Sequence, residues 1–265
     1  MKKFFAQAYL WVVLIVMYAP IIVIAVYSFT EAKVLGNWTG FSFNLYKSLF
    51  QGGAGQALTS ALINTLIIAV ISSTCATFLG TFAAVGIFYT RHKFRKNTMN
   101  ALNNIPILNP DIITGISLFL LFVALGVNQG YVTICLAHIT FCTPYVVLSV
   151  MPRLHQMNPN TYEAALDLGA TPHQALWKVI IPQVRSGMIA GFILAFTLSI
   201  DDFEVSIFNL GNNGLETLST FIYSDARRGG LSPELRPLST LVFVVVLLVL
   251  FVVNIYNARA ARKKQ

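Results

Sequence analysis

Six runs of about 20 apolar residues are the feature that most constrains this chain, because a helix of that length spans the hydrocarbon core of a bilayer. Hydrophobic residues make up 56% of the 265 residues and charged residues only 11%, a balance that an ordinary water-soluble domain does not have. We therefore expect a single all-α integral membrane domain over residues 1–265. The six predicted transmembrane helices are Tyr9–Phe29, Leu58–Tyr89, Ile105–Leu125, Tyr131–Met151, Ser186–Phe208 and Leu238–Tyr256.

The first two runs carry additional information. Lys2 and Lys3 precede the first run as in a signal peptide, but the run is long enough to span and lacks a convincing small-residue cleavage site, so we expect an uncleaved first span. In the second run, small residues recur at every fourth position, at Ala76, Gly80 and Ala84. This pattern lets another helix approach closely and predicts packing within the chain.

Basic residues cluster in the connections that alternate spans would place on one side of the membrane. By the positive-inside rule this side is the cytoplasm, so both termini and the loop over residues 156–185 are predicted to be cytoplasmic. Topology thus explains the net charge of +8 better than nucleic-acid binding does. The basic residues of the predicted cytoplasmic side include Lys2, Lys3, Arg91, Lys93, Arg95, Lys96, Arg153, Lys178, Arg185 and those of Arg259–Lys264. The other side holds Lys33, Lys47, Arg227, Arg228 and Arg236.

The loop over residues 156–185, between the fourth and fifth spans, has the pattern of two short soluble helices joined by a turn. Asn158 is a favoured N-cap residue and Pro159 suits a first helical turn, so the first helix is predicted to run from there through Leu168. Gly169 supplies the left-handed residue that ends this helix.

The second helix of this loop begins with a capping box. Thr171 is its N-cap, Pro172 fits the first helical position, and Gln174 stands three residues after the cap. Pro182 is expected to end the unit. A helix-turn-helix can bind DNA, but PHQALWKVII carries only one Lys and one His, too little charge to neutralise phosphates. A docking element for a cytosolic partner is favoured, with a membrane-anchored regulator as the alternative.

The stretch EAALDLG, followed after nine residues by VIIP, resembles the EAA motif of type I ABC importer permeases. The family pattern is E-A-A, three residues, Gly, nine residues and I-x-L-P, and Val179 and Ile181 depart from it conservatively. The resemblance implies that this loop inserts coupling helices into a cleft of a cytosolic ATPase and transmits ATP-driven closure to the spans. The residues that match the motif are Glu163, Ala164, Ala165, Gly169 and Pro182.

The same resemblance implies a set of partners in a bacterial inner membrane. These are a second homologous permease forming a heterodimer, two ATPase subunits, an extracytoplasmic solute-binding protein and membrane lipid, but no nucleic acid. The chain has no GxxxxGK[ST] phosphate loop, so ATP and Mg²⁺ are expected on the ATPase subunits, and we expect no enzymatic site or cofactor in this chain. Glu163 can pair with a basic group of the ATPase, whereas Trp177 is expected to pack on the chain's own spans.

Cys135, His138 and Cys142 lie on one predicted helical face of the fourth span. Three such ligands could hold a soft metal ion. Small buried cysteines and a hydrogen-bonded histidine are commoner in helix packing, however, so no metal site is predicted.

Four carboxylates inside the predicted spans are the clearest clue to the solute, because a charge near the bilayer centre costs at least about 2.5 kcal/mol unless it is paired or hydrated. Asp111 lies early in the third span. In the fifth span, Asp201 and Glu204 are predicted to share a helical face, with Phe203 between the acids and Asp202 rotated by about 100°. No Lys or Arg lies near them within the predicted spans. This pattern favours a pathway for a cationic solute, with acids at two depths.

The alternative is that these carboxylates are protonated, or are paired with Arg227, Arg228 or the partner permease, and serve structure or gating. The segments LSIDDFEVS and GGLSPELRPLST resemble the spermidine/putrescine permease branch, and NPDIITGISLFLLF is similar to its third span. Glu204 departs from that branch, which more often has an apolar residue there. The resemblance implies a polyamine as solute. Ferric iron, a sugar or an oxyanion are alternatives, of which an anion fits poorly beside four carboxylates.

Overall fold

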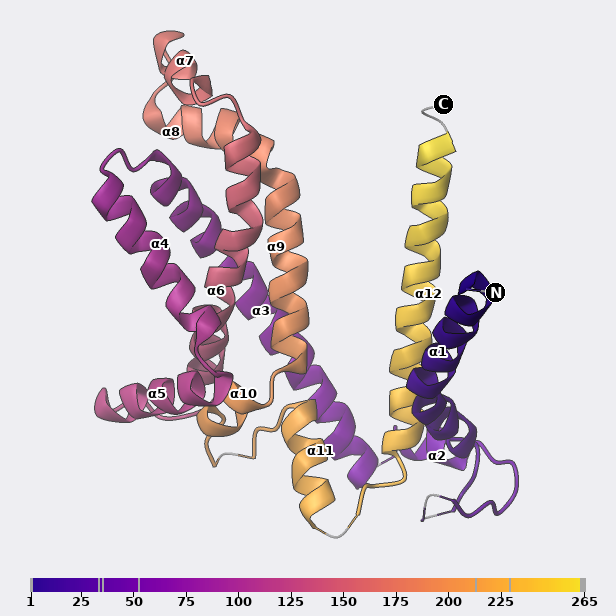
Figure 1. Ribbon diagram of the computed structural model, residues 1–265. Helices are drawn as coiled ribbons and strands as arrows, with labels where there is room; N and C mark the ends of the chain where they lie inside the picture. The colour runs from indigo at the N-terminus through magenta and orange to yellow at the C-terminus, as the bar shows by residue number, and fades with distance from the viewer. Residues whose placement is uncertain are drawn as a thin grey trace. The chain divides into compact units, whose positions relative to one another are not determined.

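Figure 1 shows the computed structural model, which describes residues 2–32, 34, 36–51, 53–212, 214–228 and 230–262. The side chains of residues 2–6, 249, 250 and 252–262 are not described, so Lys2, Lys3, Lys33 and the basic segment Arg259–Lys264 lie outside the described side chains. Within the described ranges every regular element is a helix, as predicted. The chain divides into two compact units. The first is Met1–Ser60 with Ile222–Gln265, and the second is Ala61–Phe221.

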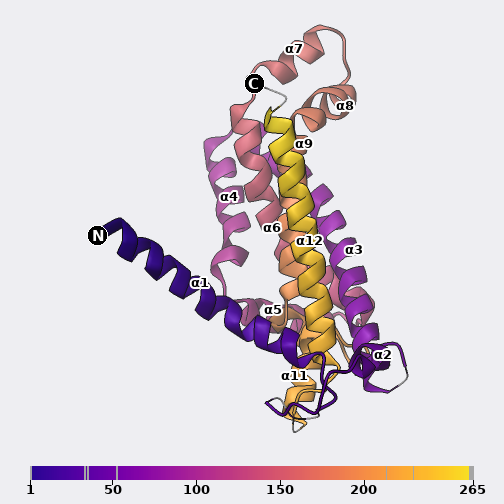
Figure 2. The same cartoon turned by 90° about the vertical axis from the view of Figure 1, so that its right-hand side faces the viewer.

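The first unit contains α1 (Lys2–Tyr27), α2 (Asn44–Ser48) and α12 (Leu235–Arg262). α1 packs on α12 through the rings of Tyr18 and Phe243, whose centroids are 6.5 Å apart, and Figure 2 shows the two helices diverging toward the N-terminus of α1. Arg236 is buried at the start of α12, where its guanidinium donates a 2.7 Å hydrogen bond to the carbonyl of Ala32. This bond joins the N-terminal and C-terminal parts of the unit.

The second unit is built around α6 and α9, which lie side by side in both views (Figures 1 and 2). Glycines bring the two backbones together, since a Cβ on Gly187 would lie only 3.0 Å from the carbonyl oxygen of Ser149. α3 and α11 belong partly to this unit and continue across its boundary. The helices are α3 (Ala54–Tyr89), α4 (Lys93–Leu108), α5 (Asp111–Ala124), α6 (Tyr131–Gln156), α7 (Thr161–Asp167), α8 (Pro172–Ala175), the π-helix η1 (Leu176–Ile180), α9 (Ile181–Asp201), α10 (Glu204–Asn209) and α11 (Leu218–Arg227).

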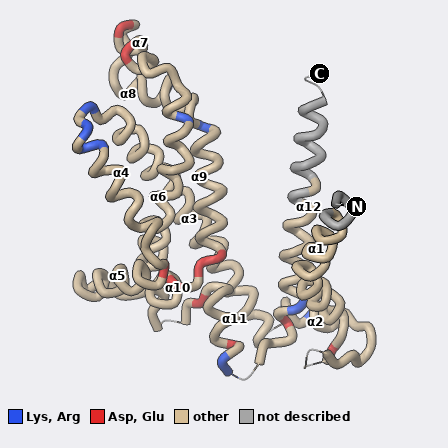
Figure 3. Tube along the Cα trace, viewed as in Figure 1, with Lys and Arg blue, Asp and Glu red and all other residues tan. Residues whose placement is uncertain are grey.

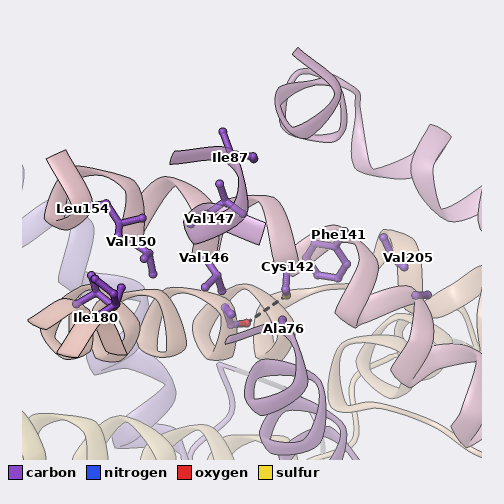
Figure 4. Packing of buried hydrophobic residues seen from close by; sticks show 14 of the residues in the cluster. Ala76, Ile87, Phe141, Cys142, Val146, Val147, Val150, Leu154, Ile180 and Val205 are labelled. Carbon is purple, nitrogen blue, oxygen red and sulfur yellow. Dashed lines mark hydrogen bonds between the residues drawn. The ribbon is translucent and has the colours of Figure 1, made fainter. Parts of the chain in front are cut away.

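Small residues also seat α3 against α6. A Cβ on Gly80 would lie 2.7 Å from the Cβ of Val146, and Ala76 and Ala84 are fully buried, which confirms that the small-residue pattern packs within the chain. Figure 4 shows the apolar core that results, in which α6 contributes Val146, Val150 and their neighbours. Because lipid is as apolar as these side chains, close packing rather than removal from water holds such helices together.

Two predicted spans are interrupted. The prediction of one helix over Ile105–Leu125 is wrong, because α4 and α5 are separate and bent by 106°. Pro110 causes this break, since it lacks a backbone N–H and forces Asn109 into an extended conformation with φ −84° and ψ 137°. The predicted helix over Ser186–Phe208 also stops early, at Asp201.

Four described helical segments are long and apolar enough to cross a membrane, and the bent pair of α4 and α5 would make a fifth. The apolar part of α12 among the described residues, Leu235–Leu248, is shorter than a span. These helices support a multi-pass membrane protein. The count of six spans stays a prediction. The four segments that are long and apolar enough are Gln7–Tyr27, Ala54–Tyr89, Tyr131–Gln156 and Pro172–Asp201.

Candidate functional site

The loop over residues 156–185 forms a compact helical turn at one end of α6 and α9 (Figures 1 and 2). Its first helix, α7, begins at Thr161 rather than at the predicted cap Asn158. The side-chain oxygen of Asn158 instead accepts a 3.0 Å hydrogen bond from the backbone N–H of Asn160, which makes a turn before the helix. Gly169 follows α7 with φ +88°, so the predicted left-handed end of this helix is confirmed.

The predicted capping box of the second helix is also confirmed. Thr171 Oγ1 accepts from the backbone N–H of Gln174 at 3.3 Å, and Gln174 Oε1 accepts from the backbone N–H of Thr171 at 3.1 Å. Both bonds satisfy N–H groups that have no partner within the helix. α8 therefore starts at Pro172, as predicted.

Pro182 does not end this unit, contrary to the prediction. The helix passes from α8 through the π-helical turn η1 directly into α9, so Pro172–Asp201 is one continuous segment of 30 residues. In the π turn the N–H of Ile181 bonds to the carbonyl of Leu176, five residues earlier. Pro182 has no N–H to satisfy at the first turn of α9 and is tolerated there. α8 is thus continuous with α9.

The loop over residues 156–185, which contains the EAA motif and is called the EAA loop below, has one exposed face and one face that packs on other helices of the chain. Ala165 and Ala175 are buried, whereas Ala164 and Glu163 are exposed, and the side chain of Leu168 is 89% exposed at the tip of the turn. Trp177 lies with its ring centroid 5.8 Å from that of Phe82 on α3, which confirms the expectation that it packs on the chain's own spans.

Glu163 makes an ion pair within the chain. Its Oε1 lies 3.3 Å from a guanidinium nitrogen of Arg91, in the connection between α3 and α4. The Arg91 and Glu163 side chains are 90% and 64% exposed, so solvent screens the pair and it contributes little to stability. Both charges can therefore exchange partners at low cost.

Besides Glu163 and Asp167 on α7, the second unit has acidic residues at the end of α6 and α9 opposite to the EAA loop, and Figure 3 shows them where α5, α9 and α10 meet. α9 ends at Asp201, α10 begins at Glu204, and Asp202 and Phe203 between them are not helical. Asp201 and Glu204 therefore do not share a helical face, contrary to the prediction. Because the helix is broken at Asp202 and Phe203, the acids Asp201, Asp202 and Glu204 lie in different local surroundings.

Asp202 is the one acid of this group with a buried carboxylate, 6% exposed. One oxygen accepts from the N–H of Val205 at 3.1 Å, and the other accepts from the N–H and the hydroxyl of Ser206 at 2.8 and 2.7 Å. Nε2 of His138, on α6, lies 3.3 Å from the second oxygen. Asp202 therefore caps α10 and is not part of an unpaired acidic face.

The other three acids, Asp111, Asp201 and Glu204, are exposed. Asp111 starts α5 and lies close enough to Asp202 and Glu204 for their charges to interact. α5 crosses α10 at short range, because a Cβ on Gly115 would lie 2.9 Å from the carbonyl oxygen of Glu204. The structure thus brings Asp111 and Glu204 into one group, where α5 and α10 cross. Phe203, which precedes α10, is half-buried beside them.

The cysteines and histidine of the fourth span take part in packing. Both ring nitrogens of His138 have hydroxyl partners, and Sγ of Cys142 donates a 3.4 Å hydrogen bond to the carbonyl of Ala195, drawn as the dashed line in Figure 4. The Cys135 carbonyl accepts from Ser72 at 3.3 Å. Among the described residues, no group of three His, Cys, Asp or Glu side chains is placed to hold a metal ion.

Solved structures support the fold. One chain of a bacterial ABC transporter involved in the import of the acidic polysaccharide alginate superposes with a TM-score of 0.73 over 96% of this chain and 96% of that one, at 17% identity. A chain of the MetNI methionine ABC transporter has a TM-score of 0.59 over 77% of this chain and 96% of its own, at 20% identity. The helical architecture is therefore that of ABC transporter membrane subunits.

Curated relatives are more similar in sequence. The putrescine transport system permease protein PotI of Escherichia coli (strain K12) is 38% identical over 94% of this chain and 89% of its own length. The spermidine/putrescine permease protein PotC of Haemophilus influenzae is 35% identical over 93% of this chain and 94% of its own length. Residues 76–265 also match the family described as the binding-protein-dependent transport system inner membrane component. This chain belongs to that family of inner membrane transport permeases.

Proposed function

We propose that this chain is a permease subunit of a bacterial ABC importer and forms half of the translocation pathway for polyamines such as putrescine and spermidine. The observation that carries the proposal is the 38% identity to a putrescine permease over 94% of the chain. The exposed acids at the meeting of α5 and α10 support it independently, since carboxylates exposed in a membrane domain suit a solute that carries positive charges.

The EAA loop is proposed to couple this subunit to ATP hydrolysis. Glu163, Ala164 and Leu168 would face the ATPase, and Gly169 would set the angle between α7 and α8. Because α8 continues through η1 into α9 as one helical segment, a push on α8 would move α9 as a unit. Ala165 would support the coupling by packing inside the loop, and Pro182 would support it by allowing the π turn. ATP and Mg²⁺ would be bound by two partner ATPase subunits.

The solute pathway is proposed to include Asp111, Asp201 and Glu204, together with Phe203, whose ring would contact an ammonium or methylene group. Asp202 contributes by holding α10 in place. A second homologous permease would supply the other half of the pathway, and an extracytoplasmic binding protein would deliver the solute. Carboxylates close together repel one another, and a dication between them relieves that repulsion.

Binding measurements distinguish the proposed function from two alternatives, which are import of a different solute and DNA binding by a membrane-anchored regulator. A binding protein encoded beside this chain should bind putrescine or spermidine in a calorimetric titration, and should not bind ferric iron, a sugar or an oxyanion. A membrane-anchored regulator would instead bind promoter DNA. Purification of the tagged permease should therefore recover an ATPase, and recovery of specific DNA in its place would contradict the proposal.

The proposed topology has six spans, with both termini and the EAA loop in the cytoplasm. Asn97 on α4 and Asn212 after α10 are both exposed. In a background without Cys75, Cys135 and Cys142, a cysteine at position 97 should react with a membrane-impermeant maleimide only in inverted vesicles. A cysteine at position 212 should react in intact cells. Reaction at position 97 in intact cells would overturn the orientation, and with it the cytosolic docking of the EAA loop.

A further inference from the structure

His138 is a buried polar residue in the N-terminal half of α6, and its side chain is 1% exposed. Its Nδ1 lies 2.6 Å from the hydroxyl of Ser199 on α9, and its Nε2 lies 3.1 Å from the hydroxyl of Ser206 on α10 and 3.3 Å from the carboxylate of Asp202. One side chain therefore joins three elements. Neither the coupling of the EAA loop nor direct contact with the solute requires such a residue.

The hydrogen bonds fix how the ring is used. The hydroxyl of Ser206 donates to Asp202, so its oxygen is left as an acceptor, and the Asp202 carboxylate is also an acceptor. Both groups can therefore accept the Nε2–H of His138. Nδ1 then accepts from the hydroxyl of Ser199. In this arrangement Nε2 holds the carboxylate and Nδ1 anchors the ring to α9.

Asp202, in turn, fixes the start of α10. Its side chain accepts from two backbone N–H groups of α10, and its carbonyl accepts a 2.6 Å hydrogen bond from the hydroxyl of Ser219 on α11. The other end of α10 is bonded to α5, because the side-chain nitrogen Nδ2 of Asn209 donates a 3.3 Å hydrogen bond to the carbonyl of Gly115. Glu204 is the first residue of α10. Its position beside Asp111 therefore depends on the Asp202 cap.

We propose that His138 is a positioning residue of the solute pathway, which acts through Asp202 to hold Glu204 beside Asp111. This inference rests on the proposed function in one respect, namely that the exposed acids contact a cationic solute. His138 is buried and cannot reach the solute, but it is expected to change the apparent affinity for the solute. A residue that only stabilised the fold would change the amount of assembled complex instead.

Two amide substitutions separate the ring nitrogens. In His138→Gln the amide nitrogen can reach the place of Nε2 and still donate to Asp202, whereas in His138→Asn it reaches only the place of Nδ1. The assembled complex is reconstituted for each variant, and initial rates of putrescine uptake are measured over a range of concentrations. We expect His138→Asn to raise KM about tenfold, the ratio that corresponds to one lost hydrogen bond to a charged group. His138→Gln should stay close to the wild-type KM.

A second measurement tests whether the effect passes through Glu204. In a Glu204→Gln background the carboxylate that His138 positions is gone, so adding His138→Asn should raise KM little further. Equal KM values for the wild type, His138→Gln and His138→Asn would overturn the proposal, and so would equal impairment of the two variants. A full additional effect of His138→Asn in the Glu204→Gln background would also overturn it, as would failure of both variants to assemble. Absence of putrescine uptake by the wild-type complex would instead refute the proposed function.

Discussion

A Gly169→Val variant is expected to insert into the membrane and to lose about nine-tenths or more of ATP-driven uptake. Gly169 has φ +88°, and a left-handed conformation costs an L-residue about 1–2 kcal/mol, with β-branched residues the least tolerant. A strain of that size corresponds to about a tenfold change in an equilibrium. The turn would open to relieve the strain, and α7 and α8 would no longer match the cleft of the ATPase.

The space around Gly169 makes this prediction specific. A Cβ built there meets no described heavy atom within 4 Å, so the expected strain comes from the backbone conformation rather than from a clash of the β-carbon. Gly169→Asn is the matched control, because asparagine tolerates the left-handed region better, and it should retain most uptake. Uptake and ATPase rate are measured in the same proteoliposomes. Normal uptake with an undisturbed ATPase rate in the Val variant would refute the docking role.

Amide substitution of the exposed acids is expected to have the second large effect. Asp111→Asn and Glu204→Gln keep the shape of the side chains but remove the charge that a polyamine ammonium group would contact. A hydrogen bond to a charged group contributes about 1.5–3 kcal/mol, so each variant should raise the KM for putrescine about tenfold or more. Because the two acids lie in one group, the double variant should fall between about tenfold and a hundredfold. Asp201→Asn should also weaken uptake.

The control for this series is a carboxylate in the first unit. Glu31 accepts hydrogen bonds from the side chains of Ser42 and Asn44, and Glu31→Gln keeps an acceptor oxygen there while removing one negative charge. It should leave putrescine uptake unchanged, which would exclude a general effect of net charge. Near-normal uptake by the Asp111→Asn, Glu204→Gln double variant, in complexes that assemble normally, would eliminate the cation pathway through this group.

The features that could be predicted from the sequence are those set by neighbouring residues. The left-handed turn at Gly169 and the capping box of Thr171 and Gln174 depend on a few adjacent side chains, so their local pattern was sufficient. The close packing of Gly80 also follows from the short repeat of small residues. In each of these cases the physical cause lies within about one or two helical turns of the residue concerned.

The sequence-based predictions were wrong where the length of an apolar run outweighed a local helix-breaking signal. They also missed interactions between residues that lie far apart in the chain. Asn109 and Pro110 gave a clear helix-breaking signal, but the apolar run on both sides suggested one continuous span. Asp202 stands three and four residues before the N–H groups that it caps, a pattern typical of a helix start. Its partner His138 is 64 residues away in the chain, so only the tertiary packing of α6 against α10 reveals the pair.

Pro182 illustrates a third limit of sequence reasoning. Proline ends many helices, but it also fits a first helical turn, and the sequence alone does not distinguish the two cases. The π turn over Leu176–Ile180 resolves the conflict by letting the N–H of Ile181 reach back five residues. α8 and α9 thereby form one continuous helical segment, a continuity that the predicted boundary at Pro182 had excluded.

Reconstitution shows whether this permease moves a polyamine by coupling to ATP hydrolysis. The chain is placed in proteoliposomes with its partner permease, the two ATPase subunits and the binding protein, and radiolabelled putrescine is followed. We expect putrescine to accumulate only when ATP is supplied. Unlabelled spermidine should compete with this uptake, and sugars and oxyanions should leave it unchanged. ATP hydrolysis without putrescine accumulation, or accumulation of an anion or sugar in its place, would contradict the proposed function.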